Sequence, residues 1–213
     1  MRRIVLASSN AGKLVEIRSV LADTGIELIA QSELGIADAD ETGTTFVENA
    51  LIKARHAAQM SGLPALGDDS GICVDALDGR PGLYSARYAG EPSNAQANID
   101  KLLGALRAVA PTRRTAHFHC TLVLLARADD PAPLIAEGLW YGSILGAPRG
   151  SHGFGYDPIF ADPVHGPAGE LDAAMRNRIS HRGLALARLR ALLRDPRALA
   201  LDDLKDEWPR ASL

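Results

Sequence analysis

Two aspartates stand side by side in the sequence Asp68-Asp69-Ser70-Gly71. Adjacent negative charges repel each other unless a cation lies close by. A divalent metal ion supplies that charge, and a carboxylate beside a metal-bound water is a suitable general base. Asp40 and Glu41 offer further oxygen ligands from an earlier segment. The alternative is an Asp/Ser/Gly turn between two strand-like runs, since these residue types favour turns.

The loop from Ser8 to Lys13 is a candidate phosphate site. Helix N-terminal amides favour anions, Gly12 lets a ligand approach the backbone closely, and Lys13 adds a mobile positive charge. The loop is not a Walker A motif, because Ala7 replaces the first glycine and Leu14 replaces the metal-binding hydroxyl. Carboxylates elsewhere must therefore hold any metal ion. An ordinary polar turn with an N-capping Ser or Asn is the competing interpretation.

Two later motifs have residue types that recognise a base. Glycines in Gly153 to Pro158 free the ring of Phe154 to lie on a flat ligand, and Asp157 is a hydrogen-bond acceptor. A hairpin with buried aromatic side chains is the alternative. Further along, His181 and Arg182 fall in the first turn of a helix, where the helix dipole disfavours cations. A ligand anion or base carbonyl would compensate them, and a charged surface turn is the alternative.

For several other residues the sequence favours a structural role over a functional one. His117 and His119 alternate along one strand, but no third ligand is visible nearby, so we do not predict a metal pair. Lys53, judged alone, is a solvated surface lysine. Cys73 and Cys120 are not in CxxC spacing, which excludes a disulfide framework and a cysteine-built zinc site.

The elements that must position these motifs alternate between strands and helices. Ile4 to Ala7 predicts a buried strand, and the residues from Leu14 to Leu21 have helical spacing. Such an order defines an α/β protein, whose ligands usually lie at the carboxyl ends of strands. Further expected elements are a strand at 27–30, a helix from Thr45 to about Met60 with a Thr45/Glu48 capping box and a stop at Gly62, and a helix at 93–109. They are followed by a strand at 116–127, one or two strands at 134–145, and a helix from Ser180 to about Arg194.

Composition narrows the function classes. The chain has 213 residues, of which 46% are hydrophobic and 23% charged, as in ordinary folded proteins. Its net charge of −3 gives no basic field for nucleic acid or an anionic membrane. The apolar run at Ile4 to Ala7 is far too short for a signal peptide or a membrane span. We therefore expect a cytoplasmic protein with a small-molecule ligand and no nucleic-acid or membrane partner.

The motifs together resemble the Ham1/RdgB family of non-canonical purine nucleotide pyrophosphatases, the inosine triphosphate pyrophosphatases. They follow the family's order over roughly residues 3 to 194. The matching segments are S-x-N-x-G-K at 8–13, E-T-G-x-T-F-x-E-N-A at 41–50, K-A-R at 53–55, D-D-S-G at 68–71, P-G-x-Y-S-A-R-Y at 81–88, G-F-G-Y-D-P-I-F at 153–160 and S-H-R-G at 180–183.

The resemblance implies an α/β fold with a long central mixed β-sheet flanked by helices, two lobes around a deep cleft, and a homodimer. Residues 1–196 would form this single two-lobed domain, and residues 197–213 a C-terminal extension that adds a short helix or frays. The implied activity is Mg²⁺-dependent hydrolysis of ITP, dITP, XTP and dXTP to the monophosphate and pyrophosphate, which cleanses the nucleotide pool.

The resemblance also implies roles for individual residues. Asp69 would be the catalytic base and a metal ligand, Glu41 the second metal ligand, and Asp68 a supporting catalytic carboxylate. The phosphates would contact Ser8, Ser9, Asn10, Ala11, Gly12, Lys13, Lys53 and Ser70, and the base and sugar would contact Phe154, Gly155, Tyr156, Asp157, Arg176, His181 and Arg182.

The chain departs from the family pattern at Arg176, where a lysine is typical, and at Met175, where an acid is frequent. A planar guanidinium fork at position 176 changes the contact geometry but keeps the charge. Two rival functions draw on the same residues. A kinase would also need an acceptor site and usually the hydroxyl that is missing at Leu14. An RNA-binding module would use the arginines of the last helix, but the acidic pI of about 6.1 and the paired carboxylates argue against it.

Overall fold

A mixed β-sheet runs through the computed structural model, which describes residues 2–194. Within this range the sheet has seven strands in the order β2-β1-β3-β4-β5-β6-β7. The β1–β2 and β1–β3 pairs are parallel and the remaining pairs are antiparallel, which confirms the predicted α/β class. The prediction for residues 197–213 lies outside the described residues. The strands are β1 (Arg2–Ala7), β2 (Ile26–Ala30), β3 (Ala65–Val74), β4 (Thr115–Leu125), β5 (Leu134–Ile144), β6 (Phe160–Asp162) and β7 (Gly166–Pro167).

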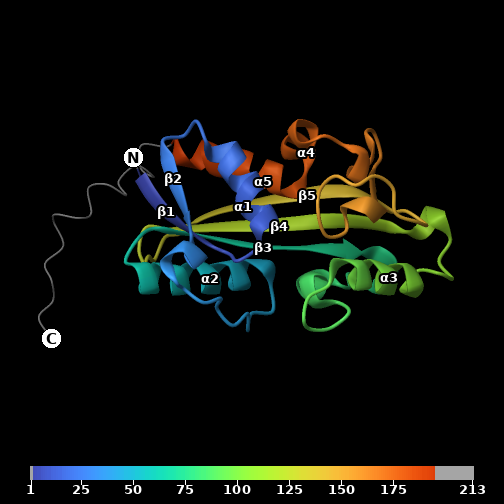
Figure 1. The fold of residues 1–213 in the computed structure, drawn as a ribbon, viewed down its shortest axis with the longest axis horizontal. Helices are drawn as coiled ribbons and strands as arrows, with labels where there is room; N and C mark the ends of the chain where they lie inside the picture. Colours follow the sequence, from blue (N-terminus) through green and yellow to red (C-terminus); the bar gives the residue numbers. More distant parts are fainter. Residues whose placement is uncertain (1, 195–213) are drawn as a thin grey trace, which may run out of the picture.

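Helices cover both faces of the sheet (Figure 1). α1 (Ala11–Leu21), α4 (Ala173–Ile179) and α5 (His181–Leu193) lie on one face, and α2 (Phe46–Ser61) and α3 (Ala95–Ala105) on the other. No helix within residues 2–194 is long and apolar enough to cross a membrane. Short 3₁₀ helices join the larger elements: η1 (Gln31–Leu34), η2 (Asp75–Leu77), η3 (Gly82–Arg87), η4 (Pro111–Arg113), η5 (Asp157–Ile159) and η6 (Ala168–Glu170).

The two faces of the sheet have different cores. On the α1 and α5 side, Leu6, Ile17 and Leu186 belong to one buried cluster of large aliphatic side chains. On the α2 side the buried residues of the helix are alanines, including Ala50 and Ala54, apart from Asn49. Small side chains at helical spacing let α2 lie close to β3, so that a Cβ at Gly67 would collide with the backbone of this helix. α2 is therefore positioned tightly against the strand that carries the two aspartates.

The predicted helix boundaries depend on local capping, and the structure confirms them where a cap is present. Thr45 and Glu48 form the expected capping box of α2, and Gly62 ends the helix in the left-handed region at φ 67°. The hydroxyl oxygen of Ser180 accepts a hydrogen bond from Gly183 N at 3.1 Å and begins α5 as predicted.

Other predicted elements change in the structure. The Asp68–Gly71 segment is not a boundary between two runs, because β3 continues through it and pairs with β4 from Ala65 to Val74. The predicted helix at 93–109 ends at Ala105, whereas the segment 134–145 forms one strand, within the one or two predicted. α4 was not predicted. Its N-cap is Asp172, whose carboxylate accepts a hydrogen bond from Met175 N at 2.7 Å.

Candidate active site

A cavity of about 890 Å³ brings the predicted motifs together. Its walls come from the β1–α1 loop, the segment before α2, the middle of α2, the middle of β3, η3, the start of α3 and the segments around residues 154 and 181. Ala11, Gly12 and Asp68 are the predicted site residues that do not line it. The predicted residues that do are Ser8, Ser9, Asn10, Lys13, Glu41, Lys53, Asp69, Ser70, Phe154, Gly155, Tyr156, Asp157, Arg176, His181 and Arg182.

The β1–α1 loop is both a capped turn and part of the cavity wall. Asn10 caps α1 by accepting a hydrogen bond from Lys13 N at 3.1 Å, and the Ser8 hydroxyl accepts one from Asn10 N at 3.2 Å. The Ser9 hydroxyl donates to the Asp38 carboxylate at 2.7 Å, which ties the loop to the segment that precedes α2. Lys13, in the first turn of α1, thus adds a positive charge to the cavity wall, as suits a phosphate site.

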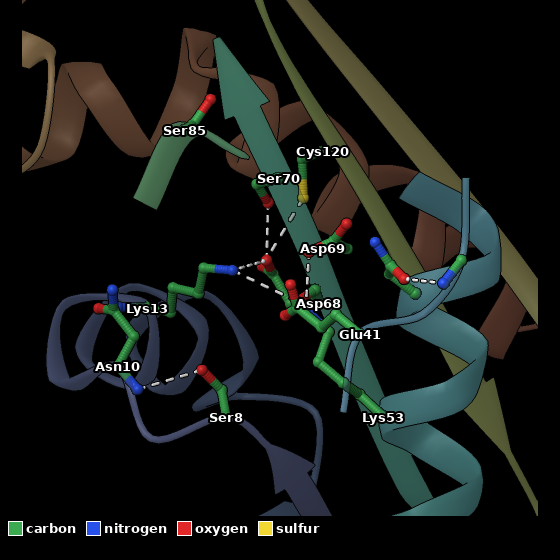
Figure 2. A network of polar contacts seen from close by, with 12 residues as sticks. Ser8, Asn10, Lys13, Glu41, Lys53, Asp68, Asp69, Ser70, Ser85 and Cys120 are labelled. Atoms are coloured by element: carbon green, nitrogen blue, oxygen red, sulfur yellow. Dashed lines mark hydrogen bonds and ion pairs between the residues drawn. The ribbon is translucent and has the colours of Figure 1, made fainter. Parts of the chain in front are cut away.

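Asp68 is fully buried and every contact of its carboxylate is with the protein (Figure 2). Oδ1 lies 2.6 Å from Lys13 Nζ and accepts a 2.6 Å hydrogen bond from the Ser70 hydroxyl. Oδ2 lies 2.7 Å from Arg182 Nε. Burial opposes ionisation, but the charges of Arg182 and Lys13 outweigh it and hold the pKa of Asp68 well below its usual range. Asp68 therefore positions two cations and has no free oxygen with which to abstract a proton.

Asp69 has the opposite environment. Its Oδ1 lies 2.7 Å from Lys53 Nζ, and its Oδ2 is buried with no hydrogen-bond partner. Burial raises the pKa of this carboxyl, although Lys53 partly offsets the effect. A carboxylate with one unpartnered oxygen, on a residue that lines the cavity, fits a general base.

Lys53 is not the solvated surface lysine that its sequence position suggests when judged alone. Its ammonium bridges Asp69 and Glu41, with a distance of 2.9 Å to Glu41 Oε1, and its side chain is 12% exposed. Burial disfavours the charged form, but the two carboxylates outweigh it and raise the pKa of Lys53. The lysine draws together two carboxylates from separate elements.

These carboxylates also fit a magnesium ion. Mg²⁺ is usually bound by one or two carboxylates together with water and substrate phosphates, so it needs no complete protein cage. The described residues contain no cluster of three or more His, Cys, Asp or Glu side chains arranged to hold a metal. Glu41 and Asp69 share one cation, and the unpartnered Oδ2 of Asp69 is a free oxygen ligand. Asp40 lines the same cavity.

At the other end of the cavity, carboxylates of the protein balance the positive charge of Arg182 in the first turn of α5. Arg182 is 2% exposed; its Nε pairs with Asp68 and its Nη1 with Glu16 Oε2 at 2.7 Å. Its Nη2 donates to the Ser70 hydroxyl at 3.2 Å. The sequence predicts that a ligand balances the positive charge of Arg182. In the structure two carboxylates from distant elements converge on the guanidinium instead.

His181 is neutral at pH 7. Burial, followed by the charge of Arg182, lowers the pKa of the imidazole well below its usual range. The ring stacks on Phe118 with centroids 4.7 Å apart, and Nδ1 is buried without a hydrogen-bond partner. A neutral imidazole causes no conflict with the helix dipole, and its free nitrogen lies in the wall of the cavity.

The segment around Phe154 combines a recognition surface with a buried turn. Asp157 Oδ2 accepts a hydrogen bond from Phe154 N at 3.0 Å, and burial raises the pKa of this carboxyl to about 6. Tyr156 is buried and donates its hydroxyl to Ser85 O at 2.8 Å, as the hairpin alternative expected for an aromatic residue. Arg176 Nε lies 3.6 Å from Glu16 and 4.0 Å from Asp157 without forming a hydrogen bond. A donor and an acceptor thus stand beside the Phe154 ring.

Gly12 also has a contact that the sequence does not predict. A Cβ at this position would lie 2.9 Å from the Phe154 ring, so the absence of a side chain makes room for that ring. This glycine does not line the cavity, and the close approach it permits is with Phe154. Gly12 links the phosphate loop to the segment predicted to hold the base.

Sequence reasoning missed four charged residues of the cavity wall, namely Glu16, Asp38, Arg87 and Glu91. Glu16 follows Lys13 by three residues on the same helix, so its helical spacing was an available signal. Arg87 lies within the P-G-x-Y-S-A-R-Y segment, which was matched to the family without a role for its arginine. Asp38 gives no signal in the sequence, because its contacts with Ser9 and Gln31 arise only from the folding of the loop.

The fold and the site together define an α/β enzyme of phosphate chemistry: cations, a helix N-terminus and a pair of carboxylates line one cavity. The chain belongs to the Ham1 family, whose model matches residues 4–192.

Curated relatives agree over almost the whole chain. A dITP/XTP pyrophosphatase of Xanthomonas campestris pv. campestris (strain 8004) is 61% identical over 190 residues, which cover 89% of this chain and 96% of that protein. A dITP/XTP pyrophosphatase of Yersinia pseudotuberculosis is 53% identical and covers 92% of this chain and 100% of its own length. Among solved structures, a HAM1 protein from Coxiella burnetii has a TM-score of 0.84 at 51% identity, covering 91% of this chain and 98% of its own.

Proposed function

We propose that this enzyme hydrolyses non-canonical purine nucleoside triphosphates, namely ITP, dITP, XTP and dXTP, to the monophosphate and pyrophosphate. The observation that carries the proposal is the arrangement around Asp69. Its Oδ1 contacts Lys53, which also contacts Glu41, its Oδ2 has no partner, and the same cavity is lined by the phosphate loop. The relatives named dITP/XTP pyrophosphatase support the same substrate class. Removal of these nucleotides would cleanse the nucleotide pool.

Triphosphate hydrolysis requires the protein mainly to position the phosphates and to orient the attacking water. In our proposal Lys13 and the amides at the start of α1 hold the phosphate chain, and Lys53 neutralises part of its charge. Asp69 accepts the proton of the attacking water. Glu41 and Asp69 would hold Mg²⁺, and the bound ion would supply further neutralisation of the phosphate oxygens.

The base would lie against Phe154, where two buried polar nitrogens have no hydrogen-bond partner. They are Nε of Arg176 and Nδ1 of His181. Buried donors without partners are costly, so a ligand acceptor that satisfies them gains affinity over a ligand that does not. A purine with a 6-oxo group supplies such an acceptor and adenine does not, which gives a physical reason for the proposed preference.

The two rival functions lose support. An RNA-binding surface on α5 would need several free arginines, but Arg182 is buried, and Arg190 donates to Val20 O and pairs with Asp23. Only Arg188, which donates to Glu137 O, and Arg194 are exposed among the four arginines of this surface. A kinase would require an acceptor site next to the phosphates, and the cavity residues match a pyrophosphatase family instead.

We also propose a homodimer, a cytoplasmic location, and no nucleic-acid or membrane partner. The family resemblance suggested the dimer, and composition and charge suggested the rest. Sedimentation equilibrium of the purified chain at several concentrations tests the dimer, since a single monomer mass throughout would contradict it.

Product analysis tests the proposed function. The enzyme is incubated with Mg²⁺ and, separately, ITP, dITP, XTP, dXTP, ATP or GTP, and products are identified by anion-exchange chromatography. We expect monophosphate and pyrophosphate from the first four nucleotides. Release of inorganic phosphate with a diphosphate product, or equal turnover of all six nucleotides, would contradict the proposal.

A further inference from the structure

Arg87 is a cation in the cavity wall that the proposed function does not use. It ends η3, and its Nη1 lies 3.4 Å from Glu41 Oε2. Its guanidinium lies over the Tyr84 ring at 5.4 Å, and its side chain is 32% exposed. Arg87 therefore combines access to the cavity with one long contact to a carboxylate, and an incoming anion has only this contact to replace.

The backbone on both sides of Arg87 is held by a buried amide. Asn98 of α3 is 4% exposed; its Nδ2 donates to Ala86 O at 2.9 Å and its Oδ1 accepts from Ala89 N at 2.6 Å. Since these groups flank Arg87 in the chain, the Asn98 side chain fixes the path of the backbone at this arginine.

The rest of η3 is anchored to β3. The Ser85 hydroxyl donates to Gly82 O at 2.6 Å and accepts from Ile72 N at 2.9 Å. A Cβ at Gly71 would collide with Gly82 O, so the strand and η3 are in close contact. The buried Tyr156 hydroxyl also bonds to Ser85 O. A mobile guanidinium on a fixed backbone is well suited to meeting a ligand at a defined place.

Arg87 is the outer end of a chain of alternating charges. Arg87 contacts Glu41, Glu41 contacts Lys53 at 2.9 Å, and Lys53 contacts Asp69 at 2.7 Å. The four charges cancel, so the row is neutral. A divalent cation on Glu41 and Asp69 would compete with both cationic side chains for these carboxylates. Of the two, Arg87 has the longer and single contact, so it is the cation that Glu41 releases more easily.

We propose that Arg87 is a phosphate-binding residue, which exchanges Glu41 for the phosphate chain of the nucleotide. This inference rests on the proposed triphosphate substrate. A guanidinium offers two parallel N–H donors to phosphate oxygens and keeps its charge at any working pH. Lys13 and Lys53 come from the helices on either side of the sheet, and Arg87 adds a third cation from η3. Like the two lysines, Arg87 would contact the phosphate chain, which is the same whichever base the nucleotide carries.

The test uses probes that separate phosphate from base. Binding of inorganic tripolyphosphate and of inosine is measured by calorimetry without Mg²⁺ for the wild type and for Arg87→Ala, Arg87→Lys and Arg107→Ala. Arg107 is exposed and does not line the cavity, so it is a matched control. We expect Arg87→Ala to weaken tripolyphosphate binding about ten- to a hundredfold, as for a lost charge-assisted hydrogen bond, and to leave inosine unchanged. Arg87→Lys should lose less, and Arg107→Ala nothing.

Steady-state kinetics supply the second readout. Arg87→Ala should raise KM for dITP and for dATP by the same factor. Unchanged tripolyphosphate affinity of Arg87→Ala would overturn the inference. Tighter Mg²⁺ binding as the only effect of this variant would also overturn it, because Arg87 would then serve merely as the counterion of Glu41. If the wild type binds tripolyphosphate through Arg87 but fails to release pyrophosphate from dITP, the proposed function fails and the role of Arg87 remains. Thermal unfolding of each variant checks that the fold is intact.

Discussion

Asp68 and Asp69 are consecutive residues of β3, but their carboxylates lie on opposite faces of the sheet. Asp68 meets Arg182 of α5 at 2.7 Å, and Asp69 meets Lys53 of α2 at 2.7 Å. The alternation of side chains along a strand produces this separation. Adjacency in the sequence predicts that the two aspartates share one cation. In the structure Asp68 contacts Lys13 and Arg182, whereas Asp69 contacts Lys53. Their pKa values move in opposite directions, because burial outweighs the lysines at Asp69, whereas at Asp68 the charges of Arg182 and Lys13 outweigh burial.

This difference predicts that Asp69→Asn abolishes turnover and leaves nucleotide binding largely intact. The amide keeps the shape of the side chain but is no longer a base. General-base catalysis is typically worth 10²–10⁴-fold, so kcat should fall by at least about a hundredfold. Turnover and equilibrium nucleotide affinity are to be measured on the same preparation. A kcat within about tenfold of the wild-type value would refute the assignment of Asp69 as the base.

Asp68→Asn should act mainly on stability. Loss of this charge leaves the buried Arg182 with Glu16 alone, and breaking a buried ion pair costs about 3–5 kcal/mol. The pKa of Asp68 is lower in the folded than in the unfolded protein, so its contribution is complete above the unfolded value of about 4 and is lost as pH falls through the folded value.

Urea denaturation from pH 7 down to pH 3 measures this effect. The difference in unfolding free energy between wild type and Asp68→Asn should be largest at pH 7 and should shrink in acid. Asp129→Asn is a suitable control, because the Asp129 side chain is 84% exposed and its pair with Arg127 lies on the surface. A variant as stable as the wild type at pH 7 would show that Asp68 does not hold these cations in place.

The contact between Gly12 and Phe154 predicts a base-dependent effect from a phosphate-loop mutation. Gly12→Ala places a Cβ 2.9 Å from the Phe154 ring and displaces it. We expect kcat/KM for ITP to fall about tenfold, in line with the roughly 1–3 kcal/mol of a base–aromatic stack, with little change in tripolyphosphate affinity. Gly104→Ala in α3 is the matched control, since a Cβ there meets no atom within 4 Å. Equal losses for tripolyphosphate and ITP would instead assign Gly12 to the phosphates.

Arg176 tests the recognition of the 6-oxo group. Its buried Nε has no hydrogen-bond partner in the protein, so we expect it to donate to the base. Arg176→Lys should be tolerated, and Arg176→Ala should lower kcat/KM for ITP about ten- to a hundredfold, with a smaller loss for ATP. The comparison of kcat/KM for both nucleotides in both variants gives the answer. Equal losses would place Arg176 on the phosphates, and no loss would remove it from the site.

Local sequence signals determined the elements that depend on neighbouring residues. The Thr45/Glu48 capping box and Gly62 fixed both ends of α2, and Ser180 fixed the start of α5. The family resemblance brought the four motifs to one site, and the cavity contains most of the residues it named. Caps and short motifs are readable from sequence because their physical cause lies within a few residues of the chain.

The tertiary structure alone decided which charges meet. Lys53 changes from a surface lysine to a buried bridge because α2 packs against β3, and the segment Asp68–Gly71 changes from a turn to a strand because β4 pairs along its whole length. Arg182 finds Asp68 and Glu16, at sequence separations of 114 and 166 residues. Burial and long-range pairing set these pKa values and contacts, and both arise only when distant elements pack together.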